Sequence, residues 1–193
     1  MLEGAGLSGE LELVCVANTH IFWDPDYPDV KLWQTHVLLQ ELEGITGPRQ
    51  LPLLLCGDFN SQPDSSVVEL LAQEQVDPKH PDLAQDKVGI LPPASQLTHT
   101  LGLVSAIAMV TGSEPPVTNY TGHYKGVLDY MFLNESLAAV SCLEFPGEEV
   151  LRGPDDTPLP NSIWPSDHIA LCVDIRLASS AVGGGHAGSS GVY

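Results

Sequence analysis

The chain has 193 residues, and its 43% hydrophobic content is enough apolar material for one domain with a buried core. Twenty-five acidic against seven basic side chains give a formal net charge of −18, which excludes a surface that captures nucleic acid through lysine and arginine alone. No apolar stretch is long enough to span a bilayer, and the first nine residues lack the cationic start and long apolar core of a secretion signal.

The first predicted strand covers residues 11–17 and ends in the polar sequence Asn18-Thr19-His20. A buried strand thus delivers hydrogen-bonding groups at its carboxyl end. His20 is therefore a candidate to contact a phosphate or sugar oxygen. A purely structural role is the alternative for a lone histidine.

Residues 30–45 are predicted as a helix with Asp29 as its N-cap, because apolar residues recur there at helical spacing and glycines follow. We expect Trp33 and Val37 to extend the buried face of this helix. A core role is the default for both of these side chains.

The central stretch of the chain is the unbroken apolar run of residues 51–56, which predicts a strand buried on both faces. It stops at Asp58, and Asn60 follows two residues later. On an extended backbone these two side chains point the same way, so they offer a proton acceptor and an amide to one reacting oxygen. The alternative is that Asp58 only begins an Asx turn.

A short helix is predicted over residues 67–72, where Ser66 has capping-box spacing from a glutamate three residues later. Residues 73–116 are the least readable part, because proline, glycine and scattered charges dominate much of it. Within it, periodicity does not decide whether residues 101–110 form a helix or a strand. Residues 137–143 are predicted as a strand.

Carboxylates and a histidine mark the remaining strands. Asp129 lies in the predicted strand 126–132, among apolar neighbours that would bury it, so it requires a histidine or a metal ion as partner. Asp167 and His168 directly precede residues 169–177, whose alternating apolar positions predict a half-buried closing strand.

The four polar strand ends, taken in chain order, resemble the signature motifs of the endonuclease/exonuclease/phosphatase superfamily of metal-dependent phosphoesterases. The matching motifs are Asn18-Thr19-His20, Gly57-Asp58-Phe59-Asn60-Ser61, Leu128-Asp129-Tyr130 and Ser166-Asp167-His168. Each motif is weak alone, and the ordered set is specific. The resemblance implies an α/β (α+β) fold that is part of a two-sheet αββα sandwich.

Further segments resemble the catalytic domain of the carbon-catabolite-repressor-type deadenylases, which are poly(A) exonuclease subunits of the NOT complex. These segments are residues 18–31, Leu97-Thr98-His99, Tyr120-Thr121 and 124–130. The resemblance implies a Mg²⁺-dependent 3′-5′ exoribonuclease that shortens poly(A) RNA, with NOT-complex subunits as possible partners. It covers about residues 11–177.

The same resemblance assigns catalytic roles. Asp58 would orient or deprotonate the attacking water, and Asn60 would contact the scissile phosphate. His20 would meet the charge that develops on the phosphate oxygens. His168 would be held by Asp129, and this pairing agrees with the physical argument that a buried carboxylate needs a partner and keeps the imidazole cationic.

The resemblance also assigns binding residues. Asp167 would bind or support Mg²⁺, an ion that suits an oxygen-rich site retaining several waters. Asn18 is assigned to substrate binding. Pro25 and Tyr124 correspond to a proline and an aromatic that sandwich the adenine, although the family usually carries phenylalanine at the second position. Ordinary packing beside a strand is the alternative for Tyr124.

The chain departs from the family pattern at its front. The family domain begins with several strands and helices that carry a glutamate ligand of Mg²⁺, and this sequence contains no matching motif. We therefore expect residues 1–10 to form an N-terminal lead, residues 11–177 the C-terminal part of the catalytic domain, and residues 178–193 a disordered Gly/Ser-rich tail. In such a truncated form, loss of that ligand would weaken Mg²⁺ binding and phosphate activation.

Two other functions stay open from the sequence. One is a phosphatase of the same superfamily that acts on a nucleotide cofactor, and the other is a non-catalytic interaction module derived from a nuclease. The four cysteines show no paired spacing, so we expect reduced thiols and an intracellular protein, cytoplasmic with the nucleus as a second location.

Overall fold

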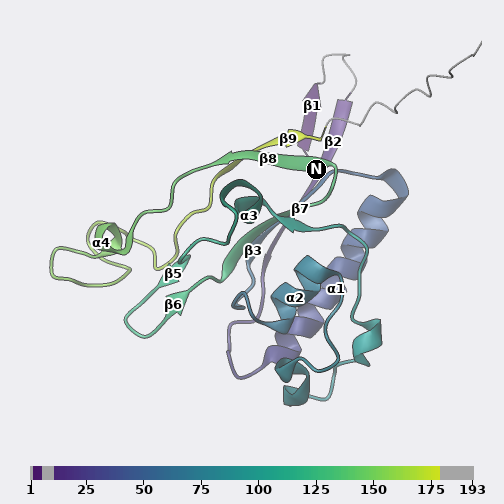
Figure 1. The fold of residues 1–193 in the computed structure, drawn as a ribbon, viewed down its shortest axis with the longest axis horizontal. Helices are drawn as coiled ribbons and strands as arrows, with labels where there is room; N and C mark the ends of the chain where they lie inside the picture. The colour runs from purple at the N-terminus through teal and green to yellow at the C-terminus, as the bar shows by residue number, and fades with distance from the viewer. Residues whose placement is uncertain (1, 6–10, 179–193) are drawn as a thin grey trace, which may run out of the picture.

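A computed structural model describes residues 2–5 and 11–178 (Figure 1). Its main sheet has the strand order β1-β2-β3-β7-β4. These strands are β1 (Leu2–Ala5), β2 (Leu11–His20), β3 (Leu53–Asp58), β7 (Asp129–Leu133) and β4 (Val104–Ser105). β2 and β3 run parallel, and the other neighbouring pairs are antiparallel. The parallel pair places the ends of β2 and β3 at the same edge of the sheet.

Two helices, α1 (Pro28–Thr46) and α2 (Ser66–Gln73), cover one face of this sheet (Figure 1). Alternate residues of β3 and β7 point toward the helices and form the largest core with them. Its fully buried members include Leu32, Leu39, Leu53, Leu55 and Phe132. This core fixes the position of the sheet edge that carries the polar strand ends. Within the described ranges, no helix has the length and apolar character needed to cross a membrane.

The opposite face of the main sheet packs against α3 (Ala106–Thr111) and a second sheet, formed by β8 (Leu137–Cys142) and β9 (Val173–Leu177). Ala106, Leu133 and Leu137 are buried between these layers. The order helix, sheet, sheet is part of the expected αββα sandwich and confirms the predicted fold class.

The second sheet has two strands, β8 and β9, in the described part of the chain. β9 begins later than the predicted strand 169–177, and the side chains of Ile175 and Leu177 are 37% and 38% exposed. Val140 of β8 is 52% exposed. The expectation of a half-buried closing strand is therefore wrong for most of β9, because no further strand of the described chain covers it.

The helix α1 begins two residues earlier than predicted, and Asp29 is not its N-cap. Tyr27 precedes the first helical residue without a capping side chain, while Asp29 is buried in the first turn. Its Oδ2 accepts a hydrogen bond from the backbone N–H of Val88 at 2.8 Å. Trp33 and Val37 are 36% and 40% exposed, so the expectation that both lie on the buried face is also wrong.

The remaining elements refine the sequence prediction. Ser65, not Ser66, caps α2, because its side chain accepts from the N–H of Val68. Residues 101–110 contain both a short strand, β4, and most of α3. The smaller elements are β5 (Asn119–Tyr120), β6 (Lys125–Gly126), α4 (Glu148–Leu151) and the short 3-10 helices Gly47–Arg49, Pro81–Gln85 and Ala94–Gln96.

Three further predictions concern residues 137–143, the N-terminal lead and the C-terminal tail. The predicted strand 137–143 is confirmed as β8. Part of the predicted N-terminal lead pairs with β2 as the strand β1. The predicted disordered tail lies outside the described residues beyond position 178.

Candidate active site

Three of the predicted site residues meet at one edge of the main sheet. The parallel pairing of β2 with β3 sets His20 opposite Asp58, and the antiparallel pairing of β3 with β7 sets Asp58 opposite Asp129. Gly57 makes the close approach possible, because its φ is +145° and a Cβ there would lie 1.9 Å from the carbonyl oxygen of Thr19.

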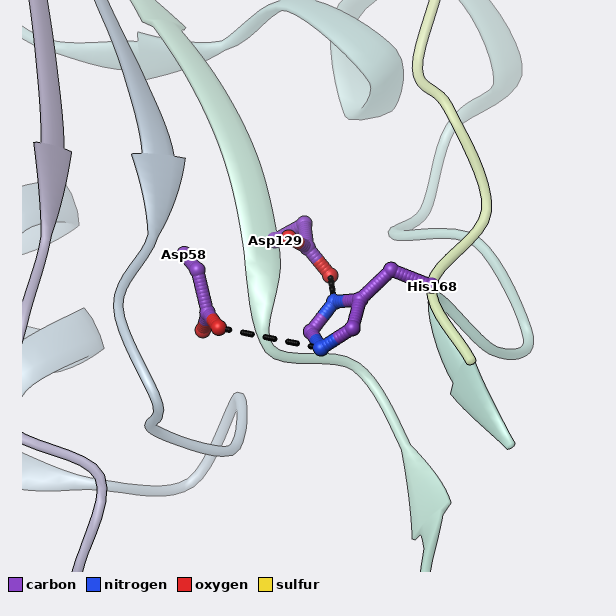
Figure 2. A group of neighbouring side chains, drawn as sticks. All are labelled: Asp58, Asp129 and His168. Atoms are coloured by element: carbon purple, nitrogen blue, oxygen red, sulfur yellow. Dashed lines mark hydrogen bonds and ion pairs between the residues drawn. The ribbon is translucent and has the colours of Figure 1, made fainter. Parts of the chain in front are cut away.

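His168 completes this group from a distant segment (Figure 2). Its Nδ1 lies 2.8 Å from Asp129 Oδ2, and its Nε2 lies 3.8 Å from Asp58 Oδ2. His20 Nε2 lies 3.6 Å from the same Asp58 oxygen. One carboxylate therefore faces two imidazoles, and the predicted pairing of His168 with Asp129 is present in the structure.

Backbone hydrogen bonds hold the His168 segment next to β5. The N–H of Tyr120 donates to the Asp167 carbonyl at 3.0 Å, and the N–H of Ile169 donates to the Thr118 carbonyl at 2.8 Å. The Thr118 hydroxyl oxygen also accepts from the N–H groups of Leu128 and Asp129. Thr118 thus ties both partners of the histidine–aspartate pair to one buried residue.

The environment shifts the pKa values of Asp58 and His168. Burial raises the pKa of the Asp58 carboxyl, the N–H of Asn60 partly offsets this, and the charge of Asp129 raises it further. Burial alone would lower the pKa of His168, but the hydrogen bond and charge of Asp129 outweigh it and raise that pKa. Asp58 is thereby a better proton acceptor, and His168 more readily carries positive charge.

Asn60 is held in a left-handed conformation with φ of +48°. Its N–H donates to Asp58 Oδ1 at 2.8 Å, and its side-chain Nδ2 donates to the Ile21 carbonyl at 2.9 Å. The Asp58–Asn60 turn is therefore the Asx turn of the alternative interpretation. That turn coexists with the site, because Asp58 Oδ2 still faces the two histidines.

Sequence reasoning missed two residues that build the site. Lys31 is buried in α1, and its Nζ donates to the Asn60 carbonyl at 2.7 Å. The burial of Lys31 is visible only in the structure, where a buried cation requires partners. The role of Thr118 could not be predicted from the sequence, because it depends on backbone contacts with residues that are distant along the chain.

A cavity of about 560 Å³ adjoins the cluster and contains most of the other predicted residues. Its lining includes Pro25, Asn60, Tyr124, Asp167 and His168. The two residues of the predicted adenine sandwich thus line one cavity. Asn18 does not line it, and its side-chain Nδ2 donates to Cys56 Sγ at 3.4 Å instead.

The cluster is chemically suited to a divalent cation. Asp58, Asp129 and His168 each offer a ligand atom, and these atoms lie within 4.8 Å of one another. Asp167 lies in the same cavity without joining this group, and its Oδ2 is 3.4 Å from Asn119 Nδ2. Carboxylate oxygens are the donors that hard divalent ions prefer, so the carboxylates at this edge suit such an ion, while His168 is paired with Asp129.

Comparison with known proteins identifies the class. A family model described as the Endonuclease/Exonuclease/phosphatase family matches residues 5–168, and the chain belongs to this family. Carbon catabolite repressor protein 4 homolog 1 of Arabidopsis thaliana is 44% identical in an alignment that covers 90% of this chain and 32% of that protein. CCR4-NOT transcription complex subunit 6-like of Danio rerio is 34% identical, with 86% of this chain and 34% of that protein covered. The predicted resemblance to the carbon-catabolite-repressor type is confirmed.

Solved structures support the fold. ANGEL2, a 2′,3′-cyclic phosphatase, gives a TM-score of 0.71 at 24% identity over 87% of this chain and 59% of that chain. The human Nocturnin catalytic domain gives a TM-score of 0.58 at 27% identity over 89% of this chain and 49% of that chain. The present chain spans about a third of the curated relatives it matches and about half of these solved chains.

Proposed function

We propose that this chain carries active-site residues of a Mg²⁺-dependent 3′-5′ exoribonuclease that acts on poly(A). The observation that carries the proposal is the meeting of Asp58, Asp129 and His168 beside a cavity large enough for a nucleotide. The printed names of relatives agree with it, since one in Aspergillus fumigatus is called a 3′-5′-exoribonuclease subunit.

In this proposal each residue has a catalytic role that its surroundings support. Asp58, with its raised pKa, accepts a proton from the attacking water or orients it. His168, kept cationic by Asp129, stabilises negative charge on the phosphate oxygens together with His20. Asn60 has one amide hydrogen beyond its bond to Ile21 and directs it at the phosphate.

Mg²⁺ would be bound or supported by the carboxylate of Asp167 and by water, beside the Asp58 carboxylate. When bound, the ion polarises the phosphoryl oxygens and neutralises part of the substrate charge. Pro25 and Tyr124, on the lining of the cavity, would stack on the terminal adenine.

The test is shortening of 3′-terminal oligo(A) with Mg²⁺ or with EDTA. We expect Mg²⁺-dependent shortening by the wild-type chain and at least about a hundredfold slower shortening by Asp58→Asn and His168→Ala, since each loses acid–base or charge-stabilising chemistry. Asp155→Asn is the matched control, because this side chain is exposed and does not line the cavity.

Three results would count against this proposal. Equal shortening by the wild-type chain, Asp58→Asn and His168→Ala refutes the site assignment. No Mg²⁺-dependent shortening by the wild-type chain refutes the activity for this chain and favours a non-catalytic interaction module. Preferential release of phosphate from NADP-like compounds or from 2′,3′-cyclic phosphate ends favours the phosphatase alternative.

Partners and location follow from the same proposal. Relatives in Danio rerio and Aspergillus fumigatus are named as subunits of CCR4-NOT complexes, so we propose NOT-complex subunits and poly(A) RNA as partners. We also propose a cytoplasmic location, with the nucleus as the second compartment to examine. Co-purification with a tagged NOT-complex subunit and imaging of the tagged chain test these two points.

A further inference from the structure

The strand β9 has one edge that pairs with no other strand of residues 2–5 and 11–178. Its other edge is hydrogen-bonded to β8, and the two strands lie side by side (Figure 1). The side chains of Ile175 and Leu177 on β9 are more than a third exposed. An open strand edge with apolar side chains can accept a further strand by backbone hydrogen bonds. This edge is therefore a candidate interaction surface.

The hydrogen bonds at the two ends of β9 show which of its backbone groups point away from β8. The carbonyl of Cys172 accepts from the Leu143 N–H at 2.9 Å, and the N–H of Ala178 donates to the Ser136 carbonyl at 2.9 Å. A register shift in this ladder falls within β8, so the alternation along β9 is unbroken. Because backbone groups alternate in direction along a strand, even-numbered residues of β9 face β8. The residues whose N–H and C=O groups face the open edge are Val173, Ile175 and Leu177.

The side chains of β9 alternate between two faces. Val173 packs against the core between the two sheets, so Ile175 and Leu177 share that face. Asp174 and Arg176 lie on the opposite face, and both are exposed. No ion pair found in the described ranges includes either of these two charged residues. The strand therefore carries a carboxylate and a guanidinium, two residues apart, beside its open edge.

This arrangement of charges is self-complementary. When two β9 strands pair antiparallel about Ile175, Asp174 of each copy lies opposite Arg176 of the other. The hydrogen-bonded pairs are then formed by the odd-numbered residues, whose backbone groups face the open edge. Asp174 and Arg176 form the non-hydrogen-bonded pairs, in which side chains approach each other most closely. Backbone hydrogen bonds and side-chain charges thus favour the same register.

The same charges disfavour the neighbouring registers. A shift of two residues sets Asp174 against its own copy in one direction and Arg176 against its own copy in the other. A shift of one residue turns the outward backbone groups of the two strands away from each other. A parallel pair in register also sets like charges side by side. Charged residues on an edge strand usually prevent pairing, whereas this pattern permits one register and opposes the others.

We propose that a second copy of this chain binds at the open edge of β9, so that two copies share one sheet with the strand order β8-β9-β9-β8. The contact is isologous and closes at the dimer, because each copy uses its edge once. It covers Ile175 and Leu177 of both copies. This interface is independent of the exonuclease proposal, since no residue of β9 lines the cavity beside His168.

Sedimentation velocity of the full chain over about a hundredfold range of concentration tests this interface. We expect a reversible monomer–dimer equilibrium with no larger species. Asp174→Arg and Arg176→Asp each set like charges against each other at both pairs of the interface. We expect at least about tenfold weaker dimerisation for each variant alone.

Charge exchange separates this register from a general effect of charge. The double variant Asp174→Arg/Arg176→Asp again places opposite charges in each pair, and we expect it to dimerise within about threefold of the wild type. An equimolar mixture of the two single variants should form a mixed dimer, because each pair then joins opposite charges. The double variant mixed with the wild type should form no mixed dimer, since both pairs would join like charges.

Ser141→Ala is the matched control for the loss of the Asp174 side chain. The Ser141 hydroxyl donates to Asp174 Oδ2 at 2.5 Å, so Asp174→Arg removes this hydrogen bond as well as a charge. Ser141→Ala removes the hydrogen bond alone, and we expect wild-type dimerisation. Unchanged circular dichroism of the variants shows that they are folded. Recovery of the dimer in the double variant excludes loss of dimerisation through unfolding.

Several outcomes would overturn the interface. They are a wild-type chain that stays monomeric over the whole range, a species larger than a dimer, and single variants that dimerise as tightly as the wild type. A mixture of the single variants that associates no better than each alone has the same meaning. Protection of the Ile175 N–H from hydrogen exchange in the monomer would show that a segment of the same chain occupies the edge, which also contradicts binding of a second copy.

Discussion

Burial lowers the pKa of His168, and the hydrogen bond and charge of Asp129, followed by the charges of Asp58 and Asp167, raise it above its ordinary value. With Asp129 present, its pKa lies above the ordinary value of 6.5, so the ionised pair stabilises the folded state below that pH. This contribution is lost as the pH rises through the raised folded-state value. The sign is that of a histidine that gains a carboxylate on folding.

Asp129→Asn should reverse the shift of His168. Without the carboxylate, burial is the dominant remaining influence, and the pKa of His168 falls below its wild-type value. An NMR titration of the imidazole in metal-free buffer measures it, with Asp155→Asn as the control that leaves the pKa in place. A His168 pKa that is the same in Asp129→Asn and the wild type would show that the pair does not govern this ionisation.

At the scale of elements, the contact between β2 and β3 depends on the absence of a side chain at position 57. Gly57→Ala would drive a methyl group into the backbone of Thr19 and push His20 away from Asp58. We expect a loss of at least about 1 kcal/mol in the free energy of unfolding, since the native φ is also unfavourable for alanine. Chemical denaturation measures the loss.

Gly44→Ala is the matched control for this prediction. Gly44 lies inside α1 with no atom within 4 Å of a built Cβ, so alanine should stabilise the protein by about 0.5–1 kcal/mol through its higher helix propensity. Two substitutions of the same kind are therefore expected to have opposite signs. Equal effects would mean that the close approach at Gly57 does not constrain the sheet.

The sequence predicted the positions of the helices and strands better than the burial of their side chains. The apolar runs that became β2, β3 and β8 and the helical spacing of α1 were sufficient to place these elements. The exposure of Trp33 and Ile175 was not predictable, because an apolar pattern does not say which other layer will cover it. Asp29 was misread for a similar reason, since its partner, Val88, lies in a loop without a pattern.

The sequence predicted those site residues that belong to the ordered motifs. Asp58, Asp129 and His168 were expected to converge, and the sheet register together with one loop brings them together. Thr118 and Lys31 act through contacts with backbone groups that are distant in the sequence, so no local spacing indicates them.

At the scale of the whole molecule, the net charge of −18 should govern how RNA binds. A basic RNA-binding surface loses affinity by orders of magnitude when salt rises from about 50 to about 200 mM, because counterions are released on binding. Here we expect the affinity for oligo(A) at constant Mg²⁺ to change less than about threefold over that range. Fluorescence anisotropy measures it, with uncharged adenosine as the control ligand. A steep loss of affinity would point to a cationic surface instead.

The pairing of His168 with Asp129 also has a consequence for biosynthesis. A chain leaving the ribosome completes β2, α1 and β3 long before residue 168 appears, so Asp58 is made while Asp129 and His168 are still untranslated. A nascent chain that stops between residues 130 and 167 contains Asp129 with no imidazole beside it. Translation must pass residue 168 before the Asp129 carboxylate can gain its imidazole partner, so a product that stops earlier would lack this pair.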